Sequence, residues 1–234
     1  MSKIAVLSDI HGNSIALQAV LEDAARQEIA VCFILGDFIG YYHRPREVLR
    51  LLEQLPYKIF AIRGNHERML EQALQGKLSW EDISMKYGHG LEMAARQLRK
   101  ERLDKLMRLP EQRLVECDGK RFLLCHGTPM EPDRYVYPDA NPAAFDFPGI
   151  KAEYVLLGHT HYPLFRTGGG FTVVNPGSVG QARDRGGFAA WCMMDTGNDV
   201  VTMRHTPYDV TPVLQDCEKY DPDVLYLQKV LLRR

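Results

Sequence analysis

Acidic, imidazole and amide side chains recur in this sequence beside glycine, at spacings that suit metal chemistry. Asp9 and His11 stand two residues apart, and so do His159 and His161. In an extended chain, residues i and i+2 point the same way, so each pair can converge on one metal centre. The remaining donors of this kind are Asp37, Asn65 and His126.

The chemical types of these donors indicate which metals they would bind. Carboxylate, imidazole and amide groups without thiolates suit Mn, Fe(II), Zn, Co or Ni better than an all-oxygen Mg or Ca site. The donors outnumber what one ion needs, so the sequence predicts two divalent transition-metal ions, with manganese as the first choice. Two such ions ~3.5–4 Å apart repel each other and need an anionic bridge. Asp37, which stands alone between the other clusters, is the candidate bridge.

Each donor follows a short apolar run that is typical of a buried strand. The predicted strands are 4–7, 31–35, 59–62, 122–124, 154–157, 171–174, 188–193 and, more weakly, 200–203. Helical patterns separate the early ones: Asn13 or Ser14 can cap the first helix, and Pro45 suits the first turn of the second. This alternation predicts an α/β fold. In open α/β sheets, ligands bind at the carboxyl ends of the strands, where these donors stand.

The chain predicts one domain over residues 1–234 with two helical additions. Residues 67–108 are rich in Leu, Met, Ala, Glu, Arg and Lys and lack proline, which predicts an insertion of two or three helices broken near Gly76 and Gly88. Residues 206–234 predict a C-terminal helical tail. About 40 residues are too few for a separate domain, so the insertion belongs to the same unit.

Composition and charge exclude several classes of partner. The net charge is −1, and 45% of the residues are hydrophobic. No basic field is present to hold a nucleic acid, and no polybasic patch to hold a membrane. The N-terminal residues show no apolar signal segment. The five cysteines contain no C-x-x-C pair, which favours reduced thiols and a cytoplasmic location.

Taken together, the motifs resemble the calcineurin-like metallophosphoesterase superfamily. In order along the chain they are D-x-H-G-N from Asp9, G-D at Asp37, G-N-H-E from Gly64, H-G at His126 and G-H-T-H from Gly158. The resemblance runs from Lys3 to about Arg185. Residues 175–180 and the pair Arg183 and Asp184 look like the small prokaryotic-type phosphodiesterase branch, and the helical stretch after Gly-Asn-His-Glu looks like the branch related to diadenosine tetraphosphatases. The resemblance implies two mixed β-sheets packed as a sandwich and flanked by helices, with a dinuclear site on one edge.

The same resemblance implies roles for individual residues. The first metal would be held by Asp9, His11, Asp37 and His161. The second would be held by Asp37, Asn65, His126 and His159. His66 would be the outer-sphere catalytic histidine, and Arg63 occupies a position that can face the phosphate.

The implied activity is hydrolysis of phosphate mono- or diesters, with a hydroxide between two metals attacking phosphorus in line. The substrate would be a small phosphate ester or a nucleotide, including dinucleoside polyphosphates. The protein phosphatases continue their second motif as G-D-x-x-D-R-G, whereas this chain reads Gly-Asp-Phe-Ile-Gly-Tyr-Tyr from Gly36, so a phosphoprotein substrate is not expected. The alternative is a non-catalytic metal-binding scaffold of the same fold. A DNA-processing nuclease is disfavoured by the charge, and homo-oligomerisation stays open.

Four residues near the motifs carry secondary expectations. Glu67 either orients local structure or is an ordinary helix-start carboxylate, and the second interpretation is favoured. Tyr41 and Tyr42, which leave the second strand end, are candidates to stack on a nucleobase. His43 either lines the substrate cleft or lies in an exposed loop.

Overall fold

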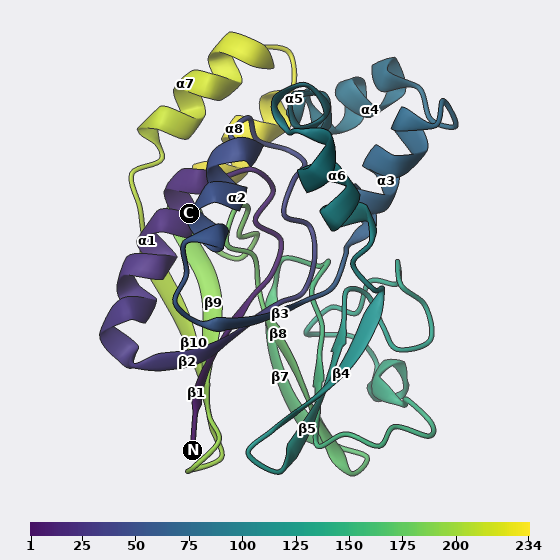
Figure 1. Cartoon of the computed structure of the whole chain (residues 1–234), viewed down its shortest axis with the longest axis vertical. Helices are drawn as coiled ribbons and strands as arrows, with labels where there is room; N and C mark the ends of the chain where they lie inside the picture. Colours follow the sequence, from purple (N-terminus) through teal and green to yellow (C-terminus); the bar gives the residue numbers. More distant parts are fainter.

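Two five-stranded mixed sheets form the frame of the protein, and the computed structural model describes all 234 residues (Figure 1). The first sheet has the order β10-β9-β1-β2-β3, and the second has the order β4-β5-β6-β8-β7. The strands of the first sheet are β1 (Lys3–Leu7), β2 (Ile29–Ile34), β3 (Lys58–Ala61), β9 (Phe188–Asp195) and β10 (Val200–Pro207). Those of the second are β4 (Gln112–Cys117), β5 (Lys120–Cys125), β6 (Tyr154–Leu156), β7 (Pro163–Gly168) and β8 (Phe171–Pro176).

Each sheet contains three neighbouring parallel strands, which are β1, β2 and β3 in the first sheet and β5, β6 and β8 in the second. In the first sheet, β9 and β10 add two antiparallel strands on one side, and β3 is the other edge. In the second sheet, the antiparallel strands β4 and β7 form the two edges. Apolar side chains of both sheets, such as Phe33 and Phe122, pack in one buried cluster between them. The predicted α/β sandwich of two mixed sheets flanked by helices is therefore confirmed.

Helices cover the outer face of the first sheet and the end where its parallel strands finish (Figure 1). Their bounds are α1 (Ser14–Ala24), α2 (Pro45–Glu53), α3 (Asn65–Leu74), α4 (Trp80–Tyr87), α5 (Gly90–Gln97), α6 (Lys100–Met107), α7 (Thr211–Tyr220) and α8 (Leu225–Leu231). Asn13 caps α1 by accepting a hydrogen bond from the Ala16 N–H, and Pro45 begins α2. No helix is both long and apolar enough to cross a membrane.

A long segment between β5 and β6, rather than an α-helix, covers the outer face of the second sheet. It contains one short 3₁₀ turn, η2 (Pro142–Phe145). Phe145 and Phe147 of this segment are buried against Val155 and Val173 of the sheet. The fourth layer of the fold is therefore an irregular segment held by apolar anchors.

The structure contains two strands and at least one helix that the sequence did not predict. β4 and β7 are the two edges of the second sheet. Most of their side chains are exposed, so the apolar pattern that marks a buried strand is absent. Between residues 65 and 107 there are four helices rather than two or three, because the backbone is extended at Leu98 and Arg99 and separates α5 from α6.

Candidate active site

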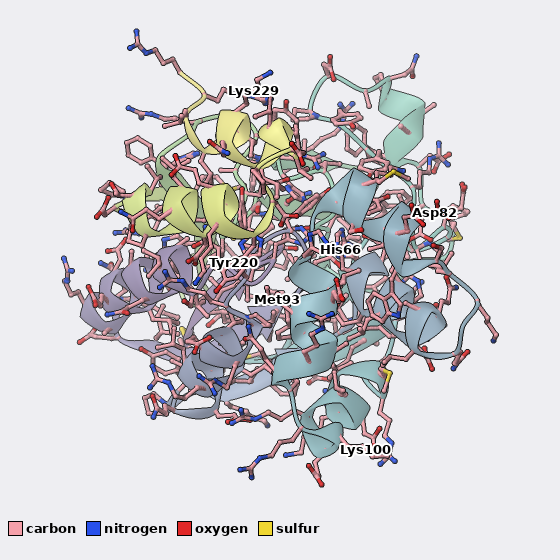
Figure 2. The ribbon with its side chains drawn as sticks, turned by 90° about the horizontal axis from the view of Figure 1, so that it is seen from above. His66, Asp82, Met93, Lys100, Tyr220 and Lys229 are labelled. Atoms are coloured by element: carbon pink, nitrogen blue, oxygen red, sulfur yellow. The ribbon has the colours of Figure 1, made fainter.

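The predicted metal donors meet at one end of the sandwich, where the parallel strands of both sheets finish. Asp9 and His11 follow β1, Asp37 follows β2, and Asn65 and His66 begin α3 just after β3. From the second sheet, His126 follows β5, and His159 and His161 follow β6. Seen from above, His66 lies near the middle of this end, among the helices (Figure 2).

The backbone at five of these positions adopts a conformation that is rare for residues with side chains. Asp9, His11, Asp37, His159 and His161 have φ between +50° and +67°. Only three other non-glycine residues of the chain share this region. The left-handed conformation costs of order 1–3 kcal/mol at each residue and is concentrated at functional sites. Here it turns the chain sharply at the strand ends, so that the side chains face one another.

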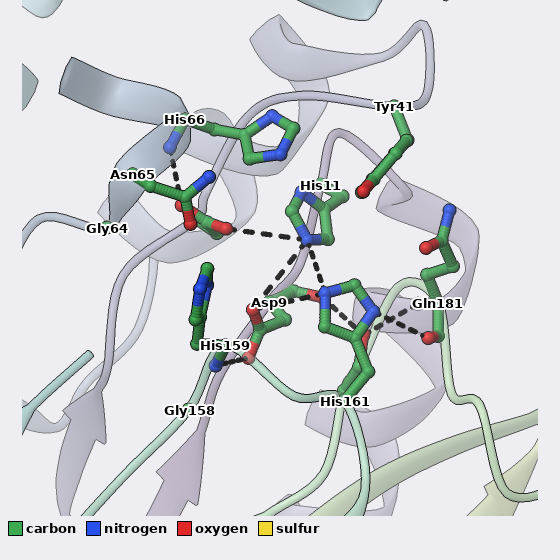
Figure 3. Close-up of polar contacts among 12 residues, drawn as sticks. Asp9, His11, Tyr41, Gly64, Asn65, His66, Gly158, His159, His161 and Gln181 are labelled. Atoms are coloured by element: carbon green, nitrogen blue, oxygen red, sulfur yellow. Dashed lines mark hydrogen bonds and ion pairs between the residues drawn. The ribbon is translucent and has the colours of Figure 1, made fainter. Parts of the chain in front are cut away.

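The first group of donors lies at the end of β1. His11 Nε2 is 3.0 Å from His161 Nε2, and Asp9 Oδ1 is 3.3 Å from His161 Nε2 and 3.7 Å from His11 Nε2 (Figure 3). All three side chains are buried, and Asp9 Oδ1 has no hydrogen-bond donor. Two ring nitrogens and a carboxylate oxygen this close together could hold one cation.

The second group shares Asp37 with the first. Asp37 Oδ2 lies 3.3 Å from His126 Nε2 and 3.6 Å from His11 Nε2. Asn65 Oδ1 is 2.9 Å from His126 Nε2, and a nitrogen of His159 also falls within 4.8 Å of the Asp37 and His126 donors. Asp37 thus stands between the two groups, as a bridging ligand must.

The four imidazoles of the two groups share a hydrogen-bonding pattern that fits metal ligation. In each ring, one nitrogen lies within 3.2 Å of a backbone carbonyl and the other faces the cluster. The carbonyls belong to Ile39 for His11, Leu35 for His126, Asp133 for His159 and Gln181 for His161. A carbonyl can only accept, so the nearby nitrogen carries a proton, and in the neutral ring the other nitrogen presents its lone pair. This is how proteins orient histidine ligands of a metal.

The electrostatics of the cluster also favour cations. Burial alone raises the pKa of a carboxyl group, but nearby histidines outweigh it and hold the pKa of Asp9 and of Asp37 well below the usual range. Burial lowers the pKa of His161 to about 4, which leaves its ring neutral. At His126 the charge of Asp37 overcomes burial and raises the pKa to about 9. A metal ion bound there would replace that proton.

Glu67 does more than begin a helix. Its carboxylate is fully buried and accepts hydrogen bonds from the backbone N–H groups of Asp37, Phe38, Ile39 and Gly64, at 2.8–3.3 Å. Burial and then the charge of Asp37 raise its pKa to about 7, against the N–H bonds from Gly64 and Asp37, which lower it. Glu67 therefore ties the loop that carries Asp37 to the start of α3. Of the two expectations for Glu67, these contacts match the less favoured one, in which the residue orients local structure.

We predict that Glu67→Gln lowers the free energy of unfolding by about 2–4 kcal/mol, because an amide has one acceptor oxygen and each buried N–H left unpaired costs about 1–3 kcal/mol. Urea unfolding of the metal-free protein measures this loss. Glu81→Gln, at an exposed position in the first turn of α4, is the matched control and should cost less than about 0.5 kcal/mol. Equal stability of the two variants would contradict the role of Glu67.

His66 lies against the cluster but differs from the four carbonyl-bonded histidines. Its backbone N–H donates to Asp37 Oδ1 at 2.9 Å, and its ring packs edge-to-face on His11 with centroids 4.6 Å apart. Its Nδ1 atom is buried without a partner. A side chain on Gly40 would collide with this ring, so glycine is required there. The His66 ring is therefore held in place, while its Nδ1 atom forms no hydrogen bond with a backbone carbonyl.

Arg63 does not point into the cluster, in contrast to its predicted phosphate-facing position. Its two terminal nitrogens bond Glu71, Glu111 and the Met107 carbonyl, each at 3.0 Å. These partners lie on α3, at the end of α6 and just after it. Two carboxylates and a carbonyl already hold the guanidinium, so it braces the helices instead.

Arg63→Met should therefore act on stability rather than on turnover. We expect a loss of about 1 kcal/mol in urea unfolding, since the two ion pairs are partly exposed. The kcat for an aryl phosphate ester should stay within about threefold of the parent value. A fall in kcat of about 10²-fold is typical of removing a hydrogen-bond donor to a transition-state anion, and it would show that Arg63 contacts the phosphate.

Of the three residues from Tyr41 to His43, the first lies beside the metal-donor cluster, and the other two contact the C-terminal helices. Tyr41 lies beside His11 with ring centroids 4.6 Å apart (Figure 3). Tyr42 is buried in an apolar cluster and donates its hydroxyl to the Leu227 carbonyl, so it cannot stack on a substrate. His43 is also buried and bonds Asp221 at 2.5 Å, so it neither lines a cleft nor lies in an exposed loop. Both residues anchor the C-terminal helices.

Sequence reasoning assigned no role in the site to Arg183 or to most of the tyrosines around the cluster. Tyr135 lies with its ring centroid 3.9 Å from that of His159, and Arg183 Nη2 lies 3.4 Å from the Tyr41 hydroxyl. Tyr135 and Tyr137 alternate in an irregular segment, and Arg183 follows a tight turn. The segment with the two tyrosines carries no signal of its own in the sequence, and the motif that contains Arg183 does not specify where its side chain lies.

Comparisons with known proteins agree with this geometry. Residues 2–199 match the calcineurin-like phosphoesterase superfamily domain. The chain is 30% identical over 227 residues to an uncharacterized protein of Methanocaldococcus jannaschii, with 89% of each covered. It is 26% identical over 212 residues to phosphodiesterase YfcE of Escherichia coli, with 87% of this chain and 91% of YfcE covered. A metallophosphoesterase from Sphaerobacter thermophilus has a similar structure, with a TM-score of 0.80 and 28% identity over 99% of this chain and 98% of that one.

Proposed function

Since the chain belongs to the calcineurin-like phosphoesterase superfamily and is a metallophosphoesterase, we propose that it hydrolyses small phosphate mono- or diesters at a dinuclear metal centre. Asp9, His11, Asp37 and His161 would hold one divalent ion. The other would be held by Asp37, Asn65, His126 and His159. Manganese is our first choice, with Fe, Zn, Co and Ni as alternatives for this donor set.

One observation carries the proposal: four imidazoles, each oriented by a backbone carbonyl, face two ionised carboxylates in a buried cluster. In the absence of a cation, such an arrangement would leave buried lone pairs and charges facing one another, which is costly. Two bound ions would supply the nucleophilic oxygen from water and stabilise the charge of the phosphorus transition state. The inclusion of diesters among the proposed substrates is supported by the similarity to the phosphodiesterase of E. coli.

In this proposal His66 holds a proton near the leaving oxygen. Burial lowers the pKa of its ring to about 3, so the ring is neutral in the free protein. The negative charge of a bound ester would raise that pKa, because an opposite charge favours the protonated ring. Its backbone bond to Asp37 and its packing on His11 fix the ring in place while Nδ1 stays free.

The proposal is tested with the purified chain, loaded in turn with each of the five metals. We expect about two ions per chain by elemental analysis and turnover of bis(p-nitrophenyl) phosphate that a chelator removes and added metal restores. Side-by-side assay of p-nitrophenyl phosphate separates diesterase from monoesterase activity. Full metal loading without turnover of either ester would favour the scaffold alternative, and loading of one ion or none would overturn the dinuclear centre.

A further inference from the structure

Six of the eleven tyrosines of the chain line one cavity of about 410 Å³ beside the histidine cluster. They are Tyr41, Tyr87, Tyr135, Tyr137, Tyr162 and Tyr226. They come from the loop after β2, from α4, from the segment after β5, from the turn before β7 and from α8. The volume is within the range of roughly 300–1,000 Å³ found for small-molecule sites. Only the tertiary fold collects these rings.

The cavity borders both proposed metal positions. The Tyr41 ring lies 4.6 Å from His11 and 4.9 Å from His66, centroid to centroid, on one side. The Tyr135 ring lies 3.9 Å from His159 on the other. Tyr137 stacks on Tyr135 with ring centroids 5.9 Å apart. A group held among these rings would therefore lie next to the phosphorus atom of an ester bound at the metals.

The charges of the lining favour an anionic ligand. Three basic residues, Lys86, Arg183 and Arg233, contribute to the cavity, and no acidic residue does. Arg183 has no carboxylate partner, and its Nε atom is buried without any hydrogen bond. Its backbone N–H donates to the His161 carbonyl at 3.3 Å, and Arg233 bonds the Arg183 carbonyl. The chain thus fixes an unpaired guanidinium beside a metal ligand.

We infer that this cavity binds the nucleoside part of a nucleotide ester, with a base stacked on the tyrosines and Arg183 facing the phosphate. The inference rests on the proposed function, because it names the substrate class of that same site. A nucleobase fits better than an alkyl group because tyrosine faces attract other π-systems, and stacking of a base on an aromatic ring contributes about 1–3 kcal/mol. The tyrosine hydroxyls also suit the polar edges of a base and a ribose.

Two diesters with the same leaving group test the inference: thymidine 5′-(p-nitrophenyl phosphate) and methyl p-nitrophenyl phosphate. They differ in the presence of a nucleoside, while the charge on phosphorus and the released p-nitrophenolate are the same. We expect the manganese-loaded chain to prefer the nucleoside ester in kcat/KM by about 10–100-fold, as one or two stacking contacts allow. Tyr137→Ala and Tyr226→Ala, at half-exposed positions that the fold tolerates, should each reduce this preference several-fold. Phe165→Ala, an exposed aromatic position on β7 outside the cavity, is the control and should keep it.

Calorimetric titration with AMP and with ribose 5-phosphate supplies a second readout that needs no turnover. The parent chain should bind AMP at least about tenfold more tightly than ribose 5-phosphate, and this difference in affinity should be lost in the two tyrosine variants. Turnover of the methyl ester with no nucleoside preference would overturn the inference and leave the proposed function intact. Failure to hydrolyse either ester would overturn the proposed function. The titrations alone would then test whether the cavity binds a nucleoside, and equal affinity for AMP and ribose 5-phosphate would contradict that.

Discussion

Asp37→Asn should remove bound metal from both positions and lower turnover by more than about 10²-fold. Mutation of a residue that only hydrogen-bonds a metal ligand already reduces metal affinity or activity by about 10–100-fold, and Asp37 is proposed as a direct ligand. The reason is the position of its carboxylate, 3.3 Å from His126 and 3.6 Å from His11, between the two groups of donors. An amide carries no charge to offset the repulsion of two cations. The folded structure should survive, because the amide oxygen can still accept the His66 N–H.

Elemental analysis and turnover of bis(p-nitrophenyl) phosphate measure the effect. Asp199→Asn is the matched control: Asp199 has φ +57°, close to the +53° of Asp37, but lies in the turn between β9 and β10. His11→Ala should mainly deplete one metal rather than both. Two ions per chain in Asp37→Asn would rule out the bridging role.

His66→Ala is expected to keep both metals and lose turnover by about 10²–10⁴-fold, the usual worth of a general acid. The four histidines proposed as ligands have carbonyl partners, whereas His66 Nδ1 has none. The size of the loss should depend on the leaving group. Methyl phenyl phosphate, which releases the more basic phenolate, should suffer more than methyl p-nitrophenyl phosphate, because a weakly basic leaving group needs less protonation.

Metal content and the two-substrate comparison separate the roles open to His66. His205→Ala, at a site paired with Asp184 outside the cluster, is the control and should change neither. Loss of one metal ion from His66→Ala would make the residue a ligand, which its closeness to His11 and Asp37 also permits. Equal losses on both esters, with metal retained, would assign it to orienting the phosphate.

The sequence by itself was sufficient for the family and for the frame of the fold. Strands buried on both faces, such as 4–7 and 122–124, are nearly continuous apolar runs, and each ends in a motif that contains Asp, His or Asn. The family match and the two mixed sheets confirm these predictions. The roles of the individual metal ligands remain predictions, although the structure brings all seven into two adjoining groups. The sequence did not predict the edge strands β4 and β7, because their exposed positions interrupt the apolar pattern that marks a buried strand.

Only the tertiary structure decided what surrounds the cluster. Motif spacing specifies which residues leave a strand end, but not which distant groups each side chain meets. Arg63 stands in a motif and is held by Glu71 and Glu111, whereas Arg183 lies far along the chain and faces the cavity. Tyr41 and Tyr42 are neighbours in sequence and are both buried in one apolar cluster, yet only the Tyr41 ring also lies beside His11 and lines the cavity. A local pattern records backbone geometry, while the direction and partners of a side chain depend on packing between segments far apart in the sequence.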